Sequence, residues 1–135
     1  CNRQPFKFYI ANKKPLSQQL INIPMGTKGF ADNVPCTIVV SGDLSYYPTE
    51  RDRHLIYIDS ALAGMQLMLA LETLGLSSCP INWPDLEDKE VKITNLLNLP
   101  QTIRPTMLIA VGYGANEGKI PYSQKKSANQ LINYI

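Results

Sequence analysis

Residues 50–74 constrain the fold more than any other part of the chain, because their apolar side chains do not keep to one side of a helix. Thr49 can cap a helix here, Glu50 and Asp52 suit the positive end of its dipole, and Gly75 is a typical stop. The apolar residues of that helix cover nearly its whole circumference: Ile56, Ile58, Ala61, Leu62, Met65, Leu67, Met68, Leu69, Leu71 and Leu74. A helix that is apolar all round is normally buried. A chain of 135 residues is too small to surround it alone, so we expect a homodimer with this helix at its centre.

The remaining apolar segments predict strands that alternate with helices. Strands are expected at residues 6–10, 35–41 and 106–112, with an extended segment at 77–82. A short helix is expected around 16–21, a second from an acidic cap at 84–88 to about 97, and a short helix or an arm at 127–135. The strand at 35–41 is almost continuously apolar, as strands covered on both faces are. We therefore expect one domain over residues 1–135, of the α/β or α+β class.

The charge balance disfavours nucleic-acid and membrane binding. Thirteen Lys and Arg against eleven Asp and Glu leave a net charge of +2, whereas those partners require a strongly basic face. The doublets Lys13-Lys14 and Lys125-Lys126 lack interleaved aromatic residues, so a nucleic-acid-binding domain is the weakest hypothesis that stays open. The apolar stretch at 61–71 is too short to cross a bilayer.

The cysteines, at positions 1, 36 and 79, indicate a reducing compartment, and we expect a cytoplasmic protein. An odd number cannot all pair within one chain, and no C-x-x-C motif or second histidine accompanies them. Neither a zinc site nor a disulfide scaffold is therefore expected. Because the sequence begins at Cys1 rather than at Met, we also expect the domain to be incomplete at its N-terminus.

Side-chain catalysis receives little support from the sequence. His54 is the only available base for a Ser or Cys nucleophile, and it lies in the charged run 50–54, which is typical of a solvated helix start. Gly112, Gly114 and Gly118 follow a strand, but their spacing is one residue longer than that of a dinucleotide-binding loop. We expect no catalytic side chain, so in an enzyme of this kind the difficult step would belong to a cofactor.

Three segments, taken in order, resemble the FMN-dependent nitroreductase family. Residues 1–8, CNRQPFKF, resemble the second half of the family's P-S-x-x-N-x-Q-P-W segment. Residues 70–81, ALETLGLSSCPI, resemble the end of its long central helix and the G-L-x-S/T-C/T-x-I that follows. Residues 100–114 and 121–126 resemble its L-P-x-x-x-x-P-x-x-x-I-A-x-G-Y strand and its closing P-x-S-x-R-K. The match covers the chain from end to end, except for the loop at 11–33.

This resemblance implies an α+β fold, a three-layer α/β/α sandwich with a long central helix, in a homodimer that binds FMN at the subunit interface. The residues it assigns to the cofactor are Cys1, Asn2, Gln4, Pro80, Ile81, Asn82, Lys125 and Lys126. The first three would lie along the flavin from across the dimer, and the main-chain N–H of Asn82 would face flavin N5. Lys125 stands where the family has Arg for the phosphate, so it keeps the charge but loses the bidentate fork.

The resemblance also implies an activity, in which NADH or NADPH passes a hydride through FMN to a nitro compound, a quinone or another small electrophile. One departure leaves an alternative open, because the family's N-terminal R-x-S-x-R phosphate clamp is absent from this chain. A non-catalytic or weakly flavin-binding dimeric module is therefore the second hypothesis. At single positions the plainer alternatives are a strand entry organised by Asn2 and Gln4, and a solvated face at Lys125 and Lys126.

Overall fold

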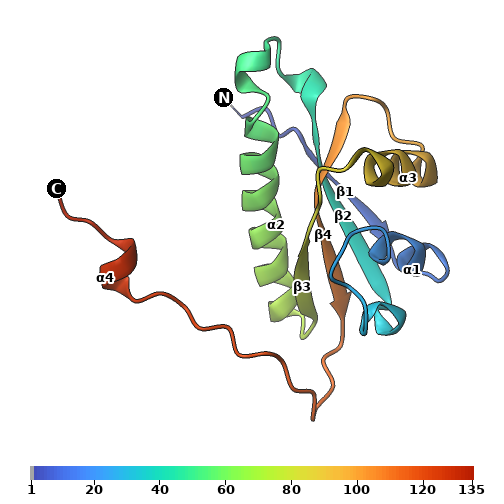
Figure 1. Cartoon of the computed structure of the whole chain (residues 1–135), viewed down its shortest axis with the longest axis vertical. Coiled ribbons are helices and arrows are strands. Elements are labelled where there is room, and N and C mark those ends of the chain that lie inside the picture. Colours follow the sequence, from blue (N-terminus) through green and yellow to red (C-terminus); the bar gives the residue numbers. More distant parts are fainter. Residues whose placement is uncertain (1) are drawn as a thin grey trace.

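A single antiparallel sheet organises the structure, a computed structural model that describes residues 2–135 (Figure 1). The strands are β1 (Phe6–Ala11), β2 (Cys36–Asp43), β3 (Ser77–Asn82) and β4 (Ile103–Gly112). The helices are α1 (Leu16–Ile21), α2 (Leu55–Thr73), α3 (Glu87–Leu97) and α4 (Ala128–Leu131), with 3₁₀ turns at Ala31–Asn33, Leu44–Tyr46 and Glu50–Asp52. In space the strands follow the order β1-β2-β4-β3, so β1 and β3 form the two edges.

Helices cover both faces of this sheet, which confirms the predicted three-layer α/β/α sandwich (Figure 1). Side chains alternate between the faces along β2, as the pleat of a strand requires. Ile38 and Val40 face α2 and belong to one core cluster with Leu71. Val39 faces the opposite way and belongs to a second cluster with Ile93 of α3. The near-continuous apolar run of β2 therefore has a physical cause, because both of its faces are buried.

β4 is longer than its sequence indicates, because Pro105 obscures where it starts. The strand begins at Ile103, although the apolar run only becomes clear at residue 106. Pro105 lies opposite Ser41, next to a register shift between Val40 and Ser41. Proline has no N–H to donate to a ladder, and a bulge is one of the few places where a sheet tolerates it. The other expected strand segments are confirmed to within two residues at each end.

α2 confirms the predicted long helix, although it begins five residues further along the chain than expected. Thr49 has an extended backbone and makes no capping hydrogen bond. Glu50–Asp52 form a 3₁₀ turn instead, within which Arg53 donates to the Glu50 carboxylate at 3.1 Å. Short 3₁₀ turns commonly lead into α-helices. At the other end Gly75 has a φ of +73°, the left-handed conformation of a glycine that ends a helix.

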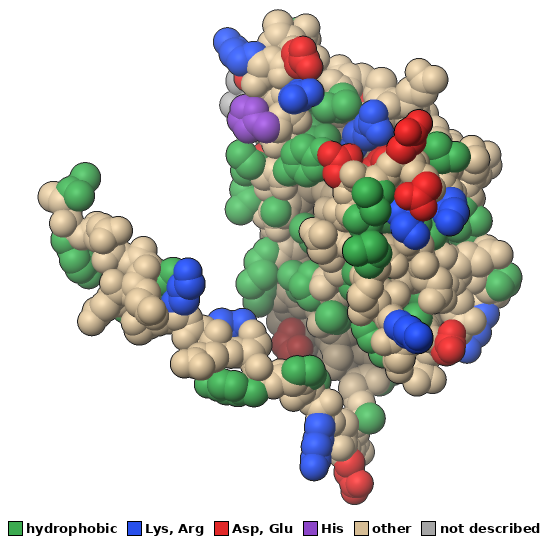
Figure 2. All heavy atoms as spheres, in the orientation of Figure 1, with side chains coloured by type: hydrophobic (Ala, Val, Ile, Leu, Met, Phe, Trp, Pro, Cys, Tyr) green, Lys and Arg blue, Asp and Glu red, His purple; other side chains and the backbone are tan. Residues whose placement is uncertain are grey.

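The chain itself covers only one side of α2. Ile56, Ser60 and Gly64 are buried against the sheet. The opposite side, called here the outer face of α2, is about half exposed or more at Tyr57, Ile58, Leu62, Met65, Leu69 and Leu74, and Figure 2 shows hydrophobic side chains along it. By length and composition alone, the helical segment Glu50–Thr73 is apolar enough to cross a membrane, a test that the core helix of a soluble protein passes as well. A helix packed between a sheet and a further protein surface has the same composition.

Residues 113–135 form an arm that leaves β4 and runs away from the sheet (Figure 1). α4 lies within it and starts with a capping box made by Ser127 and Gln130. The predicted short helix and the predicted arm are therefore both present. Apolar side chains along the arm are exposed, as Figure 2 shows: Ile120, Tyr122, Leu131, Ile132, Tyr134 and Ile135. The arm and the outer face of α2 are thus two apolar surfaces that this chain leaves uncovered.

Candidate functional site

The free edge of β3 exposes part of the backbone that the resemblance assigns to a flavin. β3 pairs with β4 alone, from Ser77 opposite Gly112 to Asn82 opposite Met107. In an antiparallel edge strand, alternate residues direct their N–H and C=O groups to the neighbouring strand and the others direct them outward. Pro80 has no N–H, so it takes an outward position, as prolines on edge strands do. Asn82 is two residues further on, and its N–H therefore faces the open edge.

The side chains at the end of β3 differ in burial. Ile81 is only 8% exposed and lies in the core cluster shared with α1 and α3. Pro80 and Asn82 are exposed. Ile81 therefore anchors the strand, while the two residues beside it leave the backbone edge open to a ligand.

The N-terminal segment lies beside the start of α2. Cys1 falls outside the described residues, and Asn2 and Gln4 are exposed. Between them, the guanidinium of Arg3 donates to the main-chain oxygen of Tyr46 and lies 5.7 Å from the centre of the Tyr47 ring. Gln4 has a φ of +49°, a left-handed conformation that is uncommon for residues other than glycine. These contacts hold the segment against the body and leave both amide side chains free to bind.

Tyr47 links this segment to α2. Its hydroxyl donates to a carboxylate oxygen of Asp59 at 3.1 Å, and its ring is 9% exposed. Burial raises the pKa of Tyr47, and the hydrogen bond to the Asp59 carboxylate raises it further. Tyr47 therefore keeps its proton and serves as a fixed donor that joins the N-terminal segment to the central helix.

Lys125 and Lys126 are not brought to the β3 edge by their own chain. Both are exposed and lie on the arm, which runs away from the sheet (Figure 1). The ammonium group of Lys125 donates to the hydroxyl of Ser123 at 2.9 Å, a contact within the arm. These two lysines can reach a site on the sheet only if the arm closes onto its own body or onto a second copy.

A polar cleft of about 410 Å³ lies just beyond the end of β3, between α2, α3 and the start of β4. Its lining combines charged and apolar side chains: Leu44, Arg53, His54, Ile56, Tyr57, Asp85, Glu90 and Arg104. Glu90 accepts a hydrogen bond from the indole N–H of Trp83 at 2.6 Å and one from Arg104 at 3.3 Å. The acidic cap predicted at 84–88 does not include Glu90, so the sequence did not point to this network. The one available signal was the position of the chain's single Trp directly after Asn82.

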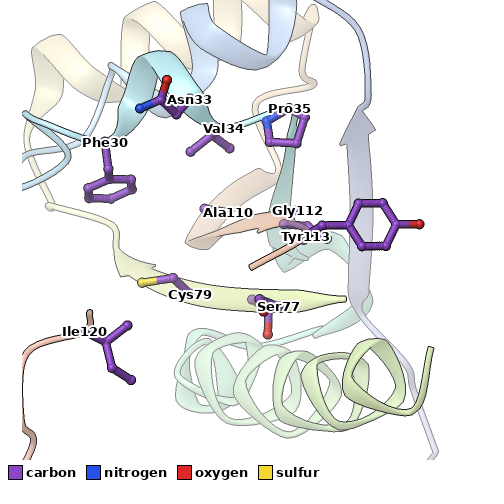
Figure 3. A pocket seen from close by; sticks show the side chains of 12 residues that line it. Phe30, Asn33, Val34, Pro35, Ser77, Cys79, Ala110, Gly112, Tyr113 and Ile120 are labelled. Carbon is purple, nitrogen blue, oxygen red and sulfur yellow. The ribbon is translucent and has the colours of Figure 1, made fainter. Parts of the chain in front are cut away.

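An apolar cavity of about 310 Å³ lies at the opposite end of β3 (Figure 3). Phe30, Val34 and Pro35 line one side of it, Cys79 of β3 another, and Ile120 of the arm a third. Its walls offer few polar groups, so it suits an apolar ligand or an apolar side chain rather than a charged cofactor. We therefore regard the open edge between the two cavities as the candidate site.

The donors that the resemblance assigns to the site suit a flavin mononucleotide better than a metal. A flavin has a polar ring edge and a phosphate, which match an outward main-chain N–H, the amides of Asn2 and Gln4, and the ammonium groups of Lys125 and Lys126. Within residues 2–135 no group of three His, Cys, Asp or Glu side chains could hold a metal ion. In one chain only the Asn82 N–H lies at the β3 edge, because Asn2 and Gln4 precede β1 at the other edge of the sheet and the two lysines lie on the arm.

Comparison with known proteins finds a matching family model and similar curated proteins. The model of the Nitroreductase family matches residues 1–113. A Bacillus subtilis protein named FMN reductase (NADPH) is 35% identical over 78 residues, which cover 57% of this chain and 30% of that protein. A second B. subtilis relative, described as the NAD(P)H nitroreductase MhqN, is 23% identical over 131 residues, covering 93% of this chain and 62% of its own length. This chain thus spans less than two thirds of the curated relatives it matches.

A solved structure shows the same fold. The FMN-dependent nitroreductase from Clostridium difficile R20291 superposes with a TM-score of 0.77 at 20% sequence identity. The superposition covers 97% of this chain and 75% of that one. The arrangement of sheet and helices described above is therefore the arrangement found in that structure.

Proposed function

The chain belongs to the nitroreductase family, and on that premise we propose that it is part of an FMN-dependent oxidoreductase that takes hydride from NADH or NADPH. Its acceptor would be a nitro compound, a quinone or another small electrophile. The observation that carries this proposal is the outward N–H of Asn82 on an open strand edge, at the position the family resemblance assigns to flavin N5. The names of the two B. subtilis relatives support the same chemistry.

Bound FMN would supply the redox chemistry, accepting a hydride and passing it on. The chain's own residues bind and orient. The Asn82 N–H donates to the ring edge, Asn2 and Gln4 donate from the N-terminal segment, and Lys125 and Lys126 balance the phosphate charge. Cys1 joins this set as a proposal only, because it lies outside the described residues. No side chain is proposed as an acid or base, since the difficult electron transfer belongs to the cofactor.

A homodimer would complete the site. The outer face of α2 is apolar along its length and uncovered, and large exposed apolar surfaces of this kind mark interfaces. A second copy packed on this face would bury both helices and bring a second N-terminal segment and a second arm close to β3. The dimer thus gives one explanation for the uncovered helix and for the distant lysines.

We place this dimer in the cytoplasm. Cys36 and Cys79 are both free thiols in the described chain, as a reducing compartment allows. The packing of α2 against the sheet favours a protein partner over lipid for its outer face.

The experiment that tests the proposal is a reduction assay with the purified chain. We expect a yellow protein after incubation with FMN and removal of free flavin, and bleaching of its visible bands by NADH or NADPH in the absence of oxygen. Adding a quinone or a nitroaromatic compound should then restore the bands. A chain that retains FMN but is not bleached by either nucleotide would contradict the oxidoreductase function.

A non-catalytic dimeric module is the second candidate. It is favoured by one observation, the position of Lys125 and Lys126 on an arm outside the body of the chain. Thermal unfolding separates the two candidates, because a ligand that binds only the folded chain raises the melting temperature. A rise with increasing FMN supports the flavoprotein, whereas an unchanged melting temperature at saturating FMN supports the module.

A further inference from the structure

Trp83 and Glu90 tie the end of β3 to two other elements. Trp83 is 8% exposed and packs in one core cluster with Ile81 and with Ile93 of α3. Its indole N–H, the only polar group of the side chain, donates to one carboxylate oxygen of Glu90 at 2.6 Å. The other oxygen of Glu90 accepts from the guanidinium of Arg104 on β4 at 3.3 Å. Glu90 thus joins β3, α3 and β4 at the mouth of the polar cleft.

This network lies where the edge strand leaves the sheet. Asn82 is the last residue of β3, and the following residues are irregular, with one local hydrogen bond from the N–H of Leu86 to the oxygen of Pro84 at 2.9 Å. The end of an edge strand, paired on one side only, tends to open locally. The buried indole of Trp83 and its bond to Glu90 are the contacts that hold the chain directly after Asn82.

We propose that Glu90 is a positioning residue, which acts through Trp83 to fix the direction of the Asn82 main-chain N–H at the open edge of β3. This inference rests on the proposed function, because only a bound flavin gives the Asn82 N–H an acceptor at the open edge. This role requires no contact between the cofactor and the side chains of Glu90 or Trp83. Their role is to keep one donor in place before the ligand arrives, so that binding does not have to order it.

The test compares Trp83→Phe and Glu90→Ala with a control, Ile93→Val. Trp83→Phe keeps an aromatic ring in the core and removes the donor, whereas Ile93→Val loosens the same core cluster and leaves the network intact. Amide hydrogen exchange of the flavin-free chain is followed at Ile81, whose N–H points to β4 because it alternates with the outward N–H of Asn82, and quenching of flavin fluorescence reports the Kd for FMN. We expect both network variants to exchange faster at residue 81 and to bind FMN about fivefold more weakly, the effect of losing one hydrogen bond.

A conservative variant separates positioning from general stability. Glu90→Gln keeps an acceptor for the indole, so we expect exchange and Kd close to those of the original chain. Ile93→Val should lower the melting temperature without changing either measurement. If Glu90→Ala fails to fold, Trp83→Phe still carries the test.

Three outcomes would overturn the inference, and one of them would overturn the proposed function as well. Unchanged exchange at residue 81 in Trp83→Phe removes the anchoring role, and faster exchange with an unchanged Kd removes its link to the cofactor. In both cases the original chain still binds FMN and the proposed function stands. If the original chain binds no FMN at all, the proposed function fails and the positioning role fails with it.

Discussion

Asp43, at the end of β2, is a buried carboxylate whose environment decides its charge. Burial raises the pKa of Asp43, but hydrogen bonds from the hydroxyl and N–H of Ser45, from Thr102 and from Lys7 outweigh it, and the pKa stays below its usual range. The hydroxyl and N–H of Ser45 lie 2.7 and 3.0 Å from the carboxylate. The ionised side chain therefore caps the 3₁₀ turn that leads to Tyr46 and Tyr47, against which the N-terminal segment rests.

Replacing Asp43 by Asn should lower the free energy of unfolding by about 1–2 kcal/mol at neutral pH, because charge-assisted hydrogen bonds are lost. A depressed pKa in the folded chain stabilises it above the ordinary value of 3.8. That stabilisation disappears as the pH falls through the folded pKa. Urea unfolding of both chains over a pH series should therefore show curves that converge below pH 3.8. If the difference in free energy of unfolding between the two chains stays constant into acid, the charge of Asp43 does not contribute to stability.

The phosphate role of the lysine pair can be tested with two ligands that differ only in phosphate. Lys125→Gln combined with Lys126→Gln should raise the Kd for FMN about tenfold, since charge-assisted contacts are removed, and should leave riboflavin binding unchanged. Lys13→Gln with Lys14→Gln is the matched control, because it removes the same charge from another exposed doublet. Equal effects on FMN and riboflavin, or from both doublets, would exclude a phosphate contact at the arm.

At the scale of elements, the sequence predicts most of the sandwich because its elements are strongly periodic or continuously apolar. The strands at 6–10 and 35–41 and the stop at Gly75 depend on local patterns and are confirmed, whereas the three-layer arrangement, also confirmed, was implied by the family resemblance. The start of α2 depends on a 3₁₀ turn, and the start of β4 depends on an irregularity next to Pro105 that arises from pairing with β2. The Trp83–Glu90 bond joins two elements and leaves no local pattern, so sequence reasoning could not find it. Of the candidate site, only the segment on β3 has a conformation that periodicity and Pro80 could predict.

Gly42 of β2 lies directly against Ile56 of α2. A Cβ added there would overlap the Cβ of Ile56, whose side chain is 1% exposed. Gly42→Ala should therefore lower the free energy of unfolding by about 1–3 kcal/mol, the usual effect of overpacking a core. The midpoint of urea denaturation measures this change.

Gly64→Ala is the control for this close approach. Its added Cβ would meet the flexible end of Met107, 3.2 Å from the sulfur, and alanine favours the helix. We expect stability to be unchanged or slightly raised. Equal losses in the two variants would contradict a specific contact between Gly42 and Ile56.

At the scale of the whole molecule, the described chain leaves two apolar surfaces uncovered, and the lysines of the proposed site lie away from the β3 edge. The proposed second copy would account for the outer face of α2, the arm and the separated lysines together. Neither the area of that contact nor the path of the arm could be predicted from sequence, because both depend on a surface that another chain supplies.

Charges placed on the outer face of α2 should separate the copies. Leu62→Glu with Leu69→Glu introduces carboxylates at positions 67% and 58% exposed in one chain, where a dimer would bury them. We expect monomers by size-exclusion chromatography with light scattering. Val91→Glu on α3 is the control, since Val91 is exposed outside this face and should leave the dimer intact. If the double variant keeps the dimer mass measured for the unsubstituted protein, this interface is ruled out.

The measurement that bears most directly on a flavin held between two copies is sedimentation velocity, followed at a visible wavelength where only FMN absorbs. With FMN added to the unsubstituted protein, we expect the flavin to sediment with a species that has twice the mass of the 15.1 kDa chain, at one flavin per chain. Flavin that stays behind as free ligand, or that travels with a single chain, would contradict a shared flavin site.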